Sequence, residues 1–185
     1  FTPYDLFDSE NFDPETMVEV RTDRAEGILE RIMILQPVRA WRPSEVPVDE
    51  IASILGIDPA EILRTGLPVE TVSTGLDQLM VPIADKETVL SMHPDLIKLA
   101  LMNKRYGIDT NHIFSLDTWH EDRVSYARHF APVVGLWEDP ATGTAAAGLG
   151  TYLLRHGVIT VGSMIMEQGN DASTLARILV EVEDD

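Results

Sequence analysis

Apolar and small residues fill almost every position of the segment 142–156, which reads TGTAAAGLGTYLLRH. A helix that is apolar all round must be buried on all sides. The alanines and glycines of this segment are small enough for surrounding strands to approach it closely, and Gly157 is placed to end it. The pattern therefore predicts a central helix enclosed by a sheet.

Short apolar or alternating runs elsewhere predict strands that are separated by polar turns. We expect these strands at 18–20, 32–35, 71–74, 79–83, 112–116, 124–130, 163–166 and 175–182. Helical spacing predicts two further helices, 48–55 and 94–105, which are followed by glycines. The segment 39–43 is interpreted as a linker. The order of elements predicts an α+β fold.

The polar start of the central helix is where we place the chemistry. The first backbone N–H groups of a helix have no acceptor within it and carry about half a positive charge. The amides of Thr142, Gly143, Thr144 and Ala145 could therefore hold a substrate carboxylate. Asp139 would lie at the rim of this cradle and, as an ionised group, would act first as a base.

A purely structural interpretation of the same residues is equally favoured by their spacing. Asp139 followed by Pro140 is a good N-cap with proline in the first turn, and Thr142 is a second acceptable cap. Nucleotide binding is excluded because a Walker loop needs Lys after its second glycine. A dinucleotide fingerprint that opened at Gly148 would need Gly where Leu153 stands.

Composition narrows the class of protein. The 185 residues carry 31 acidic and 14 basic side chains, a net charge of −17, so nucleic acids and anionic membranes are not expected partners. No apolar run approaches about 20 residues and no basic-then-apolar leader is present, so we expect a cytoplasmic protein. There is no cysteine, and the five histidines lack metal-ligand spacing, so we expect no metal.

Several sequence blocks resemble those of the phenazine-biosynthesis PhzF-like isomerase family, which shares the diaminopimelate epimerase fold. The most specific block is EDPATGTA at 138–145. The others, in the family's order, are VSTGL at 72–76 with LMVP at 79–82, RHFAP at 128–132, and EQG at 167–169. The family's Gly-Arg-Pro-Ser sequence after the last block reads ASTL at 172–175 here.

The resemblance implies two similar domains, each a curved mixed sheet around a central helix, with the active site between them. Residues 1–42 would be the C-terminal remnant of the first domain, and residues 43–185 would form the second, with the central helix at 142–156. The family's principal glutamate lies in the first domain and has no counterpart here. We therefore expect this chain to need a missing N-terminal domain or a second chain.

The resemblance also assigns roles to particular residues. Asp139 and Thr144, the latter usually Ser in the family, match catalytic positions. The substrate would be bound by the amides of the helix start and by the turn that contains Thr74 and Gly75, although Ser or Thr beside Gly is more often a plain turn. No cofactor is implied, and a homodimer is expected.

The leading hypothesis is thus a cofactor-independent isomerase or epimerase that moves a proton on a small carboxylate-bearing metabolite. Without cysteines, carboxylates must move the proton. The alternative is a non-catalytic metabolite-binding or regulatory protein on the same scaffold. Thr144 in the place of Ser and the altered segment 172–175 keep that alternative open.

Overall fold

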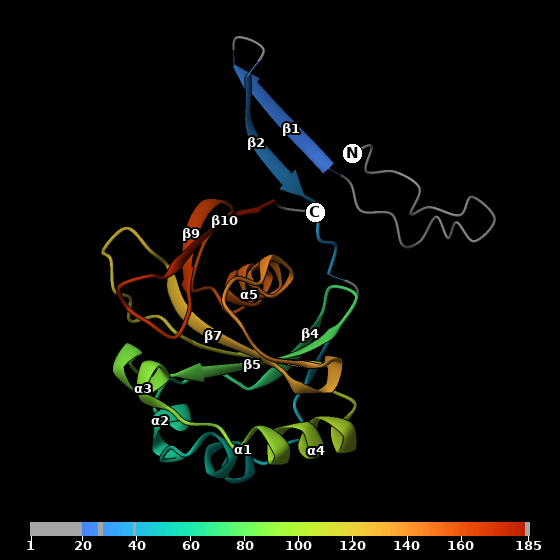
Figure 1. Ribbon diagram of the computed structural model, residues 1–185, viewed down its shortest axis with the longest axis vertical. Coiled ribbons are helices and arrows are strands. Elements are labelled where there is room, and N and C mark those ends of the chain that lie inside the picture. The colour runs from blue at the N-terminus through green and yellow to red at the C-terminus, as the bar shows by residue number, and fades with distance from the viewer. Residues whose placement is uncertain (1–19, 26–27, 39, 184–185) are drawn as a thin grey trace, which may run out of the picture. The chain divides into compact units, whose positions relative to one another are not determined.

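The computed structural model describes residues 20–25, 28–38 and 40–183, and the chain divides into two compact units, 1–37 and 38–185. In the first unit, β1 (Val20–Ala25) and β2 (Ile28–Ile34) form an antiparallel hairpin (Figure 1). The predicted strands at 18–20 and 32–35 coincide with this hairpin only in part, since residues 18 and 19 lie outside the described residues.

The second unit is built on an eight-stranded mixed sheet. Its strands follow the order β10-β9-β7-β6-β5-β4-β3, and β8 pairs with β7 beside this path. The β5–β6 and β7–β9 pairs are parallel, and the others are antiparallel. The strands are β3 (Ala40–Pro43), β4 (Glu70–Ser73), β5 (Asp77–Ile83), β6 (Thr110–Ser115), β7 (Ser125–Ala131), β8 (Leu136–Asp139), β9 (Gly162–Gln168) and β10 (Ala176–Val182).

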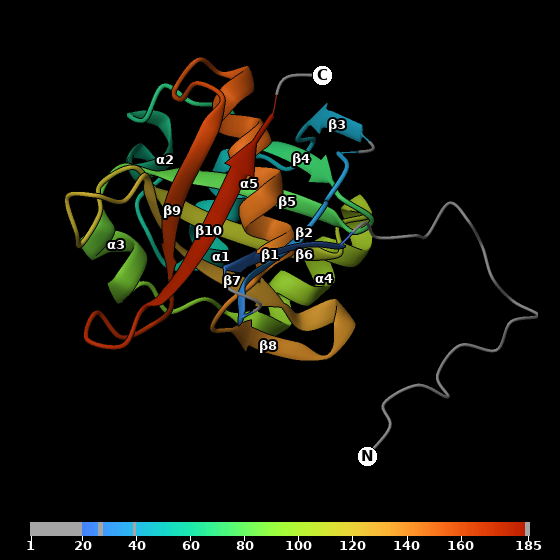
Figure 2. The same ribbon diagram turned by 90° about the horizontal axis from the view of Figure 1, so that it is seen from above.

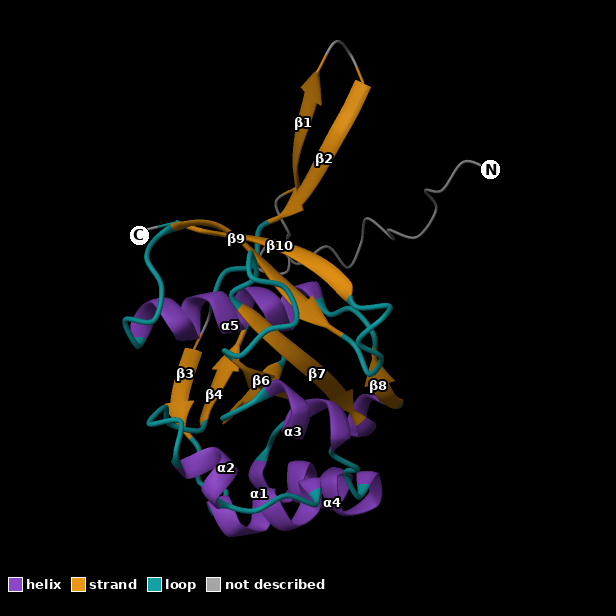
Figure 3. Ribbon diagram, turned by 90° about the vertical axis from the view of Figure 1, so that its left-hand side faces the viewer, coloured by secondary structure: helices purple, strands orange, loops and turns teal. Residues whose placement is uncertain are grey.

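Helices lie on both faces of this sheet. The long helix α5 (Gly143–Arg155) lies inside the curve of the sheet, with β9 and β10 crossing over it (Figure 2). The other helices cover the opposite face (Figure 3). They are α1 (Val48–Leu55), α2 (Ala60–Leu63), α3 (Lys86–Ser91) and α4 (Leu96–Tyr106). The prediction of a curved mixed sheet around a central apolar helix is confirmed.

The alternation of side chains along the strands divides the interior into two cores. Met80, Phe114 and Ala127 pack with α5 on the inner face. Leu79 and Ile113, each next to one of these in sequence, pack with the helices of the outer layer. Any residue of β5, β6 or β7 can therefore be assigned to a face from its position in the strand.

Two glycines let the strands approach α5. A Cβ built on Gly150 would lie 2.9 Å from Val182 Cγ2 and 3.1 Å from Val180 Cγ1 in β10. A Cβ built on Gly148 would lie 3.0 Å from Met80 Cε in β5. A small residue is therefore required at Gly150, which contacts stiff valines, whereas the flexible end of Met80 could move away from a larger residue at position 148.

The interpretation of segment 39–43 as a linker is wrong for its described part. Residues 40–43 form β3, which pairs with β4 and places Trp41 opposite Val72. The pairing is supported by Arg42, whose Nη1 donates to Asp77 Oδ2 at 2.7 Å. The segment lacks an alternating pattern of its own, so its strand conformation comes from the neighbouring β4.

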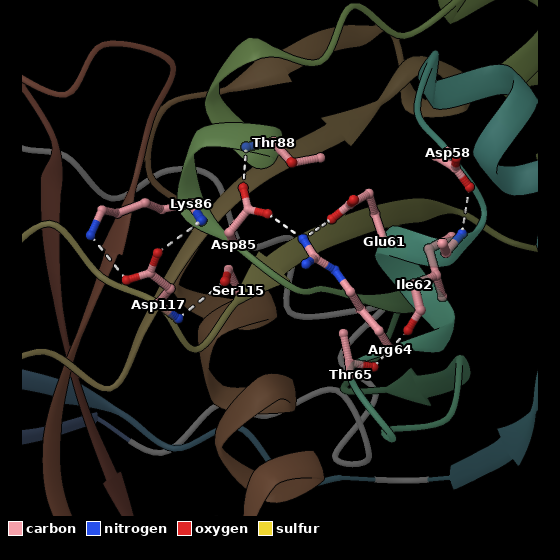
Figure 4. Close-up of polar contacts among 11 residues, drawn as sticks. Asp58, Glu61, Ile62, Arg64, Thr65, Asp85, Lys86, Thr88, Ser115 and Asp117 are labelled. Atoms are coloured by element: carbon pink, nitrogen blue, oxygen red, sulfur yellow. Dashed lines mark hydrogen bonds and ion pairs between the residues drawn. The ribbon is translucent and has the colours of Figure 1, made fainter.

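Polar contacts tie the outer layer together at α2 and α3 (Figure 4). Arg64, which follows α2, pairs with Glu61 and with Asp85, whose Oδ2 lies 2.6 Å from Arg64 Nη2. Asp85 is also the N-cap of α3 and accepts from Thr88 N at 2.7 Å. Lys86 donates to Asp117 Oδ1 at 2.9 Å. Capping and ion pairs thus stabilise helices too short to show a hydrophobic period.

Within the described residues, none of the helices has both the length and the apolar character that a membrane crossing requires.

The close approach at Gly150 predicts the outcome of adding a methyl group there. We expect Gly150→Ala to lower the free energy of unfolding by about 1–3 kcal/mol, as overpacking does, because valine is stiff at χ1 and β10 would have to shift. The matched control is Gly143→Ala in the same helix, where no heavy atom lies within 4 Å of the built Cβ. Urea denaturation measures both, and equal effects of the two substitutions would contradict the close contact.

Candidate functional site

Three segments meet at the start of α5. Thr74 lies just after β4, Asp139 ends β8, and Gln168 ends β9. Each of them forms a hydrogen bond to the first turn of the helix or to Thr142, its N-cap residue. The structure therefore gathers residues distant in sequence around the helix start that the sequence analysis singled out.

Asp139 is partly exposed and holds the turn before the helix rather than capping the helix itself. Its Oδ2 accepts from Thr142 Oγ1 at 2.7 Å, and its Oδ1 accepts from Ala141 N at 3.3 Å. The N-cap position belongs to Thr142, whose side chain makes no capping bond, and Pro140 lies outside the helix. The prediction that Asp139 is the N-cap, with Pro140 in the first turn, is therefore wrong. The prediction of Thr142 as the N-cap is confirmed for its position.

The free amides of the helix start can be identified individually. Ala146 N donates to Thr142 O at 3.0 Å, and this is the first bond of the i to i−4 ladder. The amides of Gly143, Thr144 and Ala145 come before it and so lack a ladder acceptor. The Thr142 amide is already used, because it donates to Gln168 Oε1 at 3.1 Å. The possible anion cradle thus consists of three amides rather than four.

Thr74 lies against the first turn of α5. Its hydroxyl donates to Thr144 O at 3.4 Å and accepts from Gln78 Nε2 at 2.7 Å. Gly75 follows in the exposed turn between β4 and β5, where its φ of 118° suits glycine. The Thr144 side chain is half-buried, and its hydroxyl makes no hydrogen bond to any residue that the structure describes.

Gln168 connects the parts of the site and was not among the predicted site residues. Its side chain is 1% exposed. Nε2 donates to Asp139 O at 2.6 Å and to Thr142 Oγ1 at 2.9 Å, while Oε1 accepts from the Thr142 amide. The one sequence signal for it was its place in the EQG block. Gln168 therefore fixes the turn that presents Asp139.

Glu138 has a different role from its neighbour Asp139. It forms a bidentate ion pair with Arg128, with Nε–Oε1 at 2.8 Å and Nη2–Oε2 at 2.9 Å. Arg128 is buried and also donates from Nη1 to Met92 O, just after α3, at 2.9 Å. This arrangement fixes β8 against β7 and leaves Asp139 as the carboxylate at the helix start.

Two buried histidines lie on the strands next to β8. His129 in β7 is opposite Asp139 in β8 and opposite His112 in β6. The two Nδ1 atoms are 3.2 Å apart. Burial lowers the pKa of His129 to about 4 against the opposing effect of the Asp139 charge, and burial with the neighbouring imidazole lowers the pKa of His112 well below 6.5. Neither histidine was among the predicted site residues.

No metal centre is evident in the part of the chain that the structure describes, because it contains no group of three or more His, Asp or Glu side chains suited to an ion. His120, the exposed histidine of the turn after β6, pairs instead with the buried Glu167. Glu167 Oε2 also accepts from Trp119 N at 3.0 Å. The carboxylate of the EQG block thus holds this turn against β9.

Comparison with known proteins shows similarity to one family. The family described as phenazine biosynthesis-like protein, PhzC-PhzF, matches residues 16–185. An uncharacterized isomerase of Deinococcus radiodurans is 33% identical over 138 residues, 72% of this chain and 44% of the relative. The uncharacterized isomerase YfhB of Bacillus subtilis is 30% identical over 167 residues, 90% of this chain and 56% of the relative.

A further relative carries a more specific name. The trans-2,3-dihydro-3-hydroxyanthranilate isomerase of Pseudomonas chlororaphis is 26% identical over 144 residues, 77% of this chain and 46% of that protein. The chain therefore spans about half the length of the curated relatives that it matches.

Solved structures confirm the fold. The phenazine biosynthesis protein of the PhzF family from Bacillus anthracis has a TM-score of 0.73 at 22% identity, covering 88% of this chain and 55% of that one. A predicted epimerase from Pseudomonas aeruginosa has a TM-score of 0.67 at 23% identity, covering 89% and 55%. At these identities the likeness concerns the fold alone.

The buried histidines predict a pH dependence of stability. Their pKa values are lower in the folded state, so the unfolded chain binds protons first as the pH falls from about 6.5 toward 4. Each imidazole should then lower the free energy of unfolding by up to about 1.4 kcal/mol per pH unit in this window. Urea denaturation at pH 7, 6 and 5 should reveal the slope. His129→Gln should reduce the slope of the unfolding free energy against pH by about half. The control His93→Gln, at an exposed position, should leave this slope unchanged.

The contacts of Gln168 predict that a nearly isosteric change is harmful. Gln168→Glu replaces the donors to Asp139 O and Thr142 Oγ1 by carboxylate oxygens, so we expect a loss of about 2–4 kcal/mol in the free energy of unfolding at pH 7. Burial disfavours the charged form, so the loss should shrink as the pH falls and the new carboxyl is protonated. The control is Asn170→Asp, two residues away and exposed. A loss that does not depend on pH would argue against a buried charge as its cause.

Proposed function

The chain belongs to the phenazine biosynthesis-like protein family, PhzC-PhzF, and on this premise we propose that it forms part of a cofactor-independent isomerase or epimerase. The substrate would be a small metabolite that carries a carboxylate. The observation that carries the proposal is the juxtaposition of the Asp139 carboxylate with the unused amides of Gly143, Thr144 and Ala145 at the start of α5.

The proposed reaction moves one proton. The three amides would bind the carboxylate of the substrate, and Asp139 would take a proton from the adjacent carbon. A second group would donate a proton to another position or to the other face. The negative charge that develops on the substrate would be stabilised by the same amides and by the positive end of the helix. General acid–base catalysis accelerates a reaction by about 10²–10⁴-fold. The electrostatic stabilisation by the amides would have to supply the rest of the rate enhancement. The Thr144 hydroxyl is available as a further donor to the substrate.

The complete reaction needs a second acid or base on the opposite side of the substrate. Because the chain spans about half the length of its relatives, we propose that this group comes from a polypeptide segment beyond residues 1–185 or from a second chain. A homodimer remains the expected assembly. The name of the Pseudomonas chlororaphis relative makes trans-2,3-dihydro-3-hydroxyanthranilate a suitable first candidate substrate.

A second candidate function is binding without catalysis. Both oxygens of Asp139 already accept hydrogen bonds, from Ala141 N and Thr142 Oγ1, as expected of a carboxylate that only stabilises a turn. A metabolite-binding or regulatory protein would keep the anion cradle and have no need for a free base. Measurements of binding and of proton exchange on the same compounds separate the two functions.

The test is incorporation of solvent deuterium into trans-2,3-dihydro-3-hydroxyanthranilate and other small carboxylic acids by the protein expressed from its complete reading frame. We expect exchange by the unaltered protein and a loss of at least about 10²-fold in Asp139→Asn, because that change removes the base. Glu121→Gln, which neutralises an exposed carboxylate, is the matched control. Unchanged exchange in Asp139→Asn would exclude Asp139 as the base, and binding without exchange would favour the second function.

A further inference from the structure

Gln78 of β5 is a buried polar residue that lies against the first turns of α5. It is 1% exposed and projects to the inner face of the sheet, two positions before Met80, which packs with α5. A Cβ built on Gly148 would lie 3.6 Å from Gln78 Nε2, so the amide group lies beside the helix. A buried amide needs hydrogen-bond partners, and those of Gln78 are at the helix start.

Both protons of the Gln78 amide are used there. Nε2 donates to Thr74 Oγ1 at 2.7 Å and to Thr144 O at 3.4 Å. The Thr74 hydroxyl accepts from Gln78 and donates its own proton to Thr144 O at 3.4 Å. Because a carbonyl oxygen only accepts, the NH₂ end of Gln78 must face Thr144, and its Oε1 cannot. Gln78 and Thr74 thus form a closed set of hydrogen bonds that ends at one backbone oxygen.

This backbone oxygen belongs to the same peptide unit as one of the three unused amides. The bond between Thr144 and Ala145 is trans. A trans peptide group is planar and directs its C=O and its N–H in opposite directions. Donors that hold Thr144 O in place therefore also fix the direction of the Ala145 N–H.

The same donors strengthen the Ala145 N–H. Hydrogen bonds in a chain polarise one another, so an N–H whose own carbonyl accepts becomes a better donor. Thr144 O has two side-chain donors besides the helical amide four residues later. Among the described residues, no side chain donates to Thr142 O or Gly143 O, the carbonyls of the other two amide units. Ala145 therefore supplies the amide with the most side-chain support.

We propose that Gln78 and Thr74 are positioning residues, which hold the peptide unit of Thr144 and Ala145 so that its N–H points at the carboxylate of a bound acid. While Thr74 makes this contact, its single proton is not free for a substrate. Gln168 holds the other side of the same turn. The inference rests on the anion cradle of the proposed function, but it does not depend on proton transfer by Asp139.

The first test observes this peptide unit by NMR in the protein expressed from its complete reading frame. Thr followed by Ala occurs once in residues 1–185, so labelling with ¹³C′-threonine and ¹⁵N-alanine gives one carbonyl–amide correlation from this chain. Its loss in Thr144→Ser assigns it. We expect Gln78→Met and Thr74→Val to move the Thr144 carbonyl carbon and the Ala145 amide proton upfield, because the carbonyl loses a donor. Unmoved signals in both variants would overturn the proposal.

The second test measures carboxylate binding without chemistry. Benzoate is titrated into the same protein, and the Ala145 amide proton reports its binding. We expect Gln78→Met and Thr74→Val each to weaken benzoate binding by about 3- to 10-fold, the effect of one hydrogen bond. Thr74→Ser, which keeps the hydroxyl, should restore the affinity. No response of Ala145 in the unaltered protein, or equal affinity in all variants, would contradict the inference.

Thr71→Val is the matched control, since Thr71 lies in the same strand, is 3% exposed and projects to the opposite face. It should change neither the signals nor the affinity, and an effect as large as that of Thr74→Val would overturn the proposal. Should Gln78→Met fail to fold, Thr74→Val at its half-buried position decides. Benzoate binding without deuterium exchange on any acid would contradict the proposed isomerase and leave this inference in place.

Discussion

The enclosure of α5 by a curved sheet is the constraint on which the rest of this structure depends. A helix surrounded by strands can place polar chemistry only at its ends, because its sides must be apolar and small where the strands come close. At the C-terminal end the polar groups are paired: Tyr152 Oη donates to Pro68 O at 2.6 Å, and His156 Nε2 lies 3.0 Å from Glu70 Oε2. At the N-terminal end three amides precede the hydrogen-bond ladder. A helix N-terminus presents N–H donors and a C-terminus presents carbonyl oxygens, so only the N-terminal end of α5 can bind an anion through its backbone.

The sheet gives different tasks to adjacent residues of one sequence block. Successive residues of a strand project to opposite faces, so Glu138 binds Arg128 on the outer side while Asp139 lies at the helix start on the inner side. The same alternation separates Arg128 from His129 one strand away. The two acidic residues of the EDPATG block therefore have different roles: Glu138 holds β8 in place, and Asp139 belongs to the candidate site.

The elements predicted well from sequence are those with a strong internal pattern. The helix over 48–55 begins and ends where expected, and the central helix differs from its prediction by one residue at each end. The elements that were missed depend on partners elsewhere: β3 on β4, β8 on β7, and the short helices α2 and α3 on caps and ion pairs. Gln168 and His129 were not predicted as site residues for the same reason: the pairing of strands, and not a local sequence pattern, brings them to Asp139.

The strong negative charge of the chain constrains how an anionic substrate could be recognised. With a net charge of −17, the long-range field repels a carboxylate, but at physiological ionic strength this field is screened beyond about 8 Å. The buried arginine nearest to Asp139 in sequence, Arg128, is already paired with Glu138. Within the part of the chain that the structure describes, the groups proposed to recognise the carboxylate are therefore short-range dipoles, namely the three amides at the start of α5. Fixed amides neither titrate nor reorient when charge develops on the substrate, which suits the proton transfer proposed for Asp139.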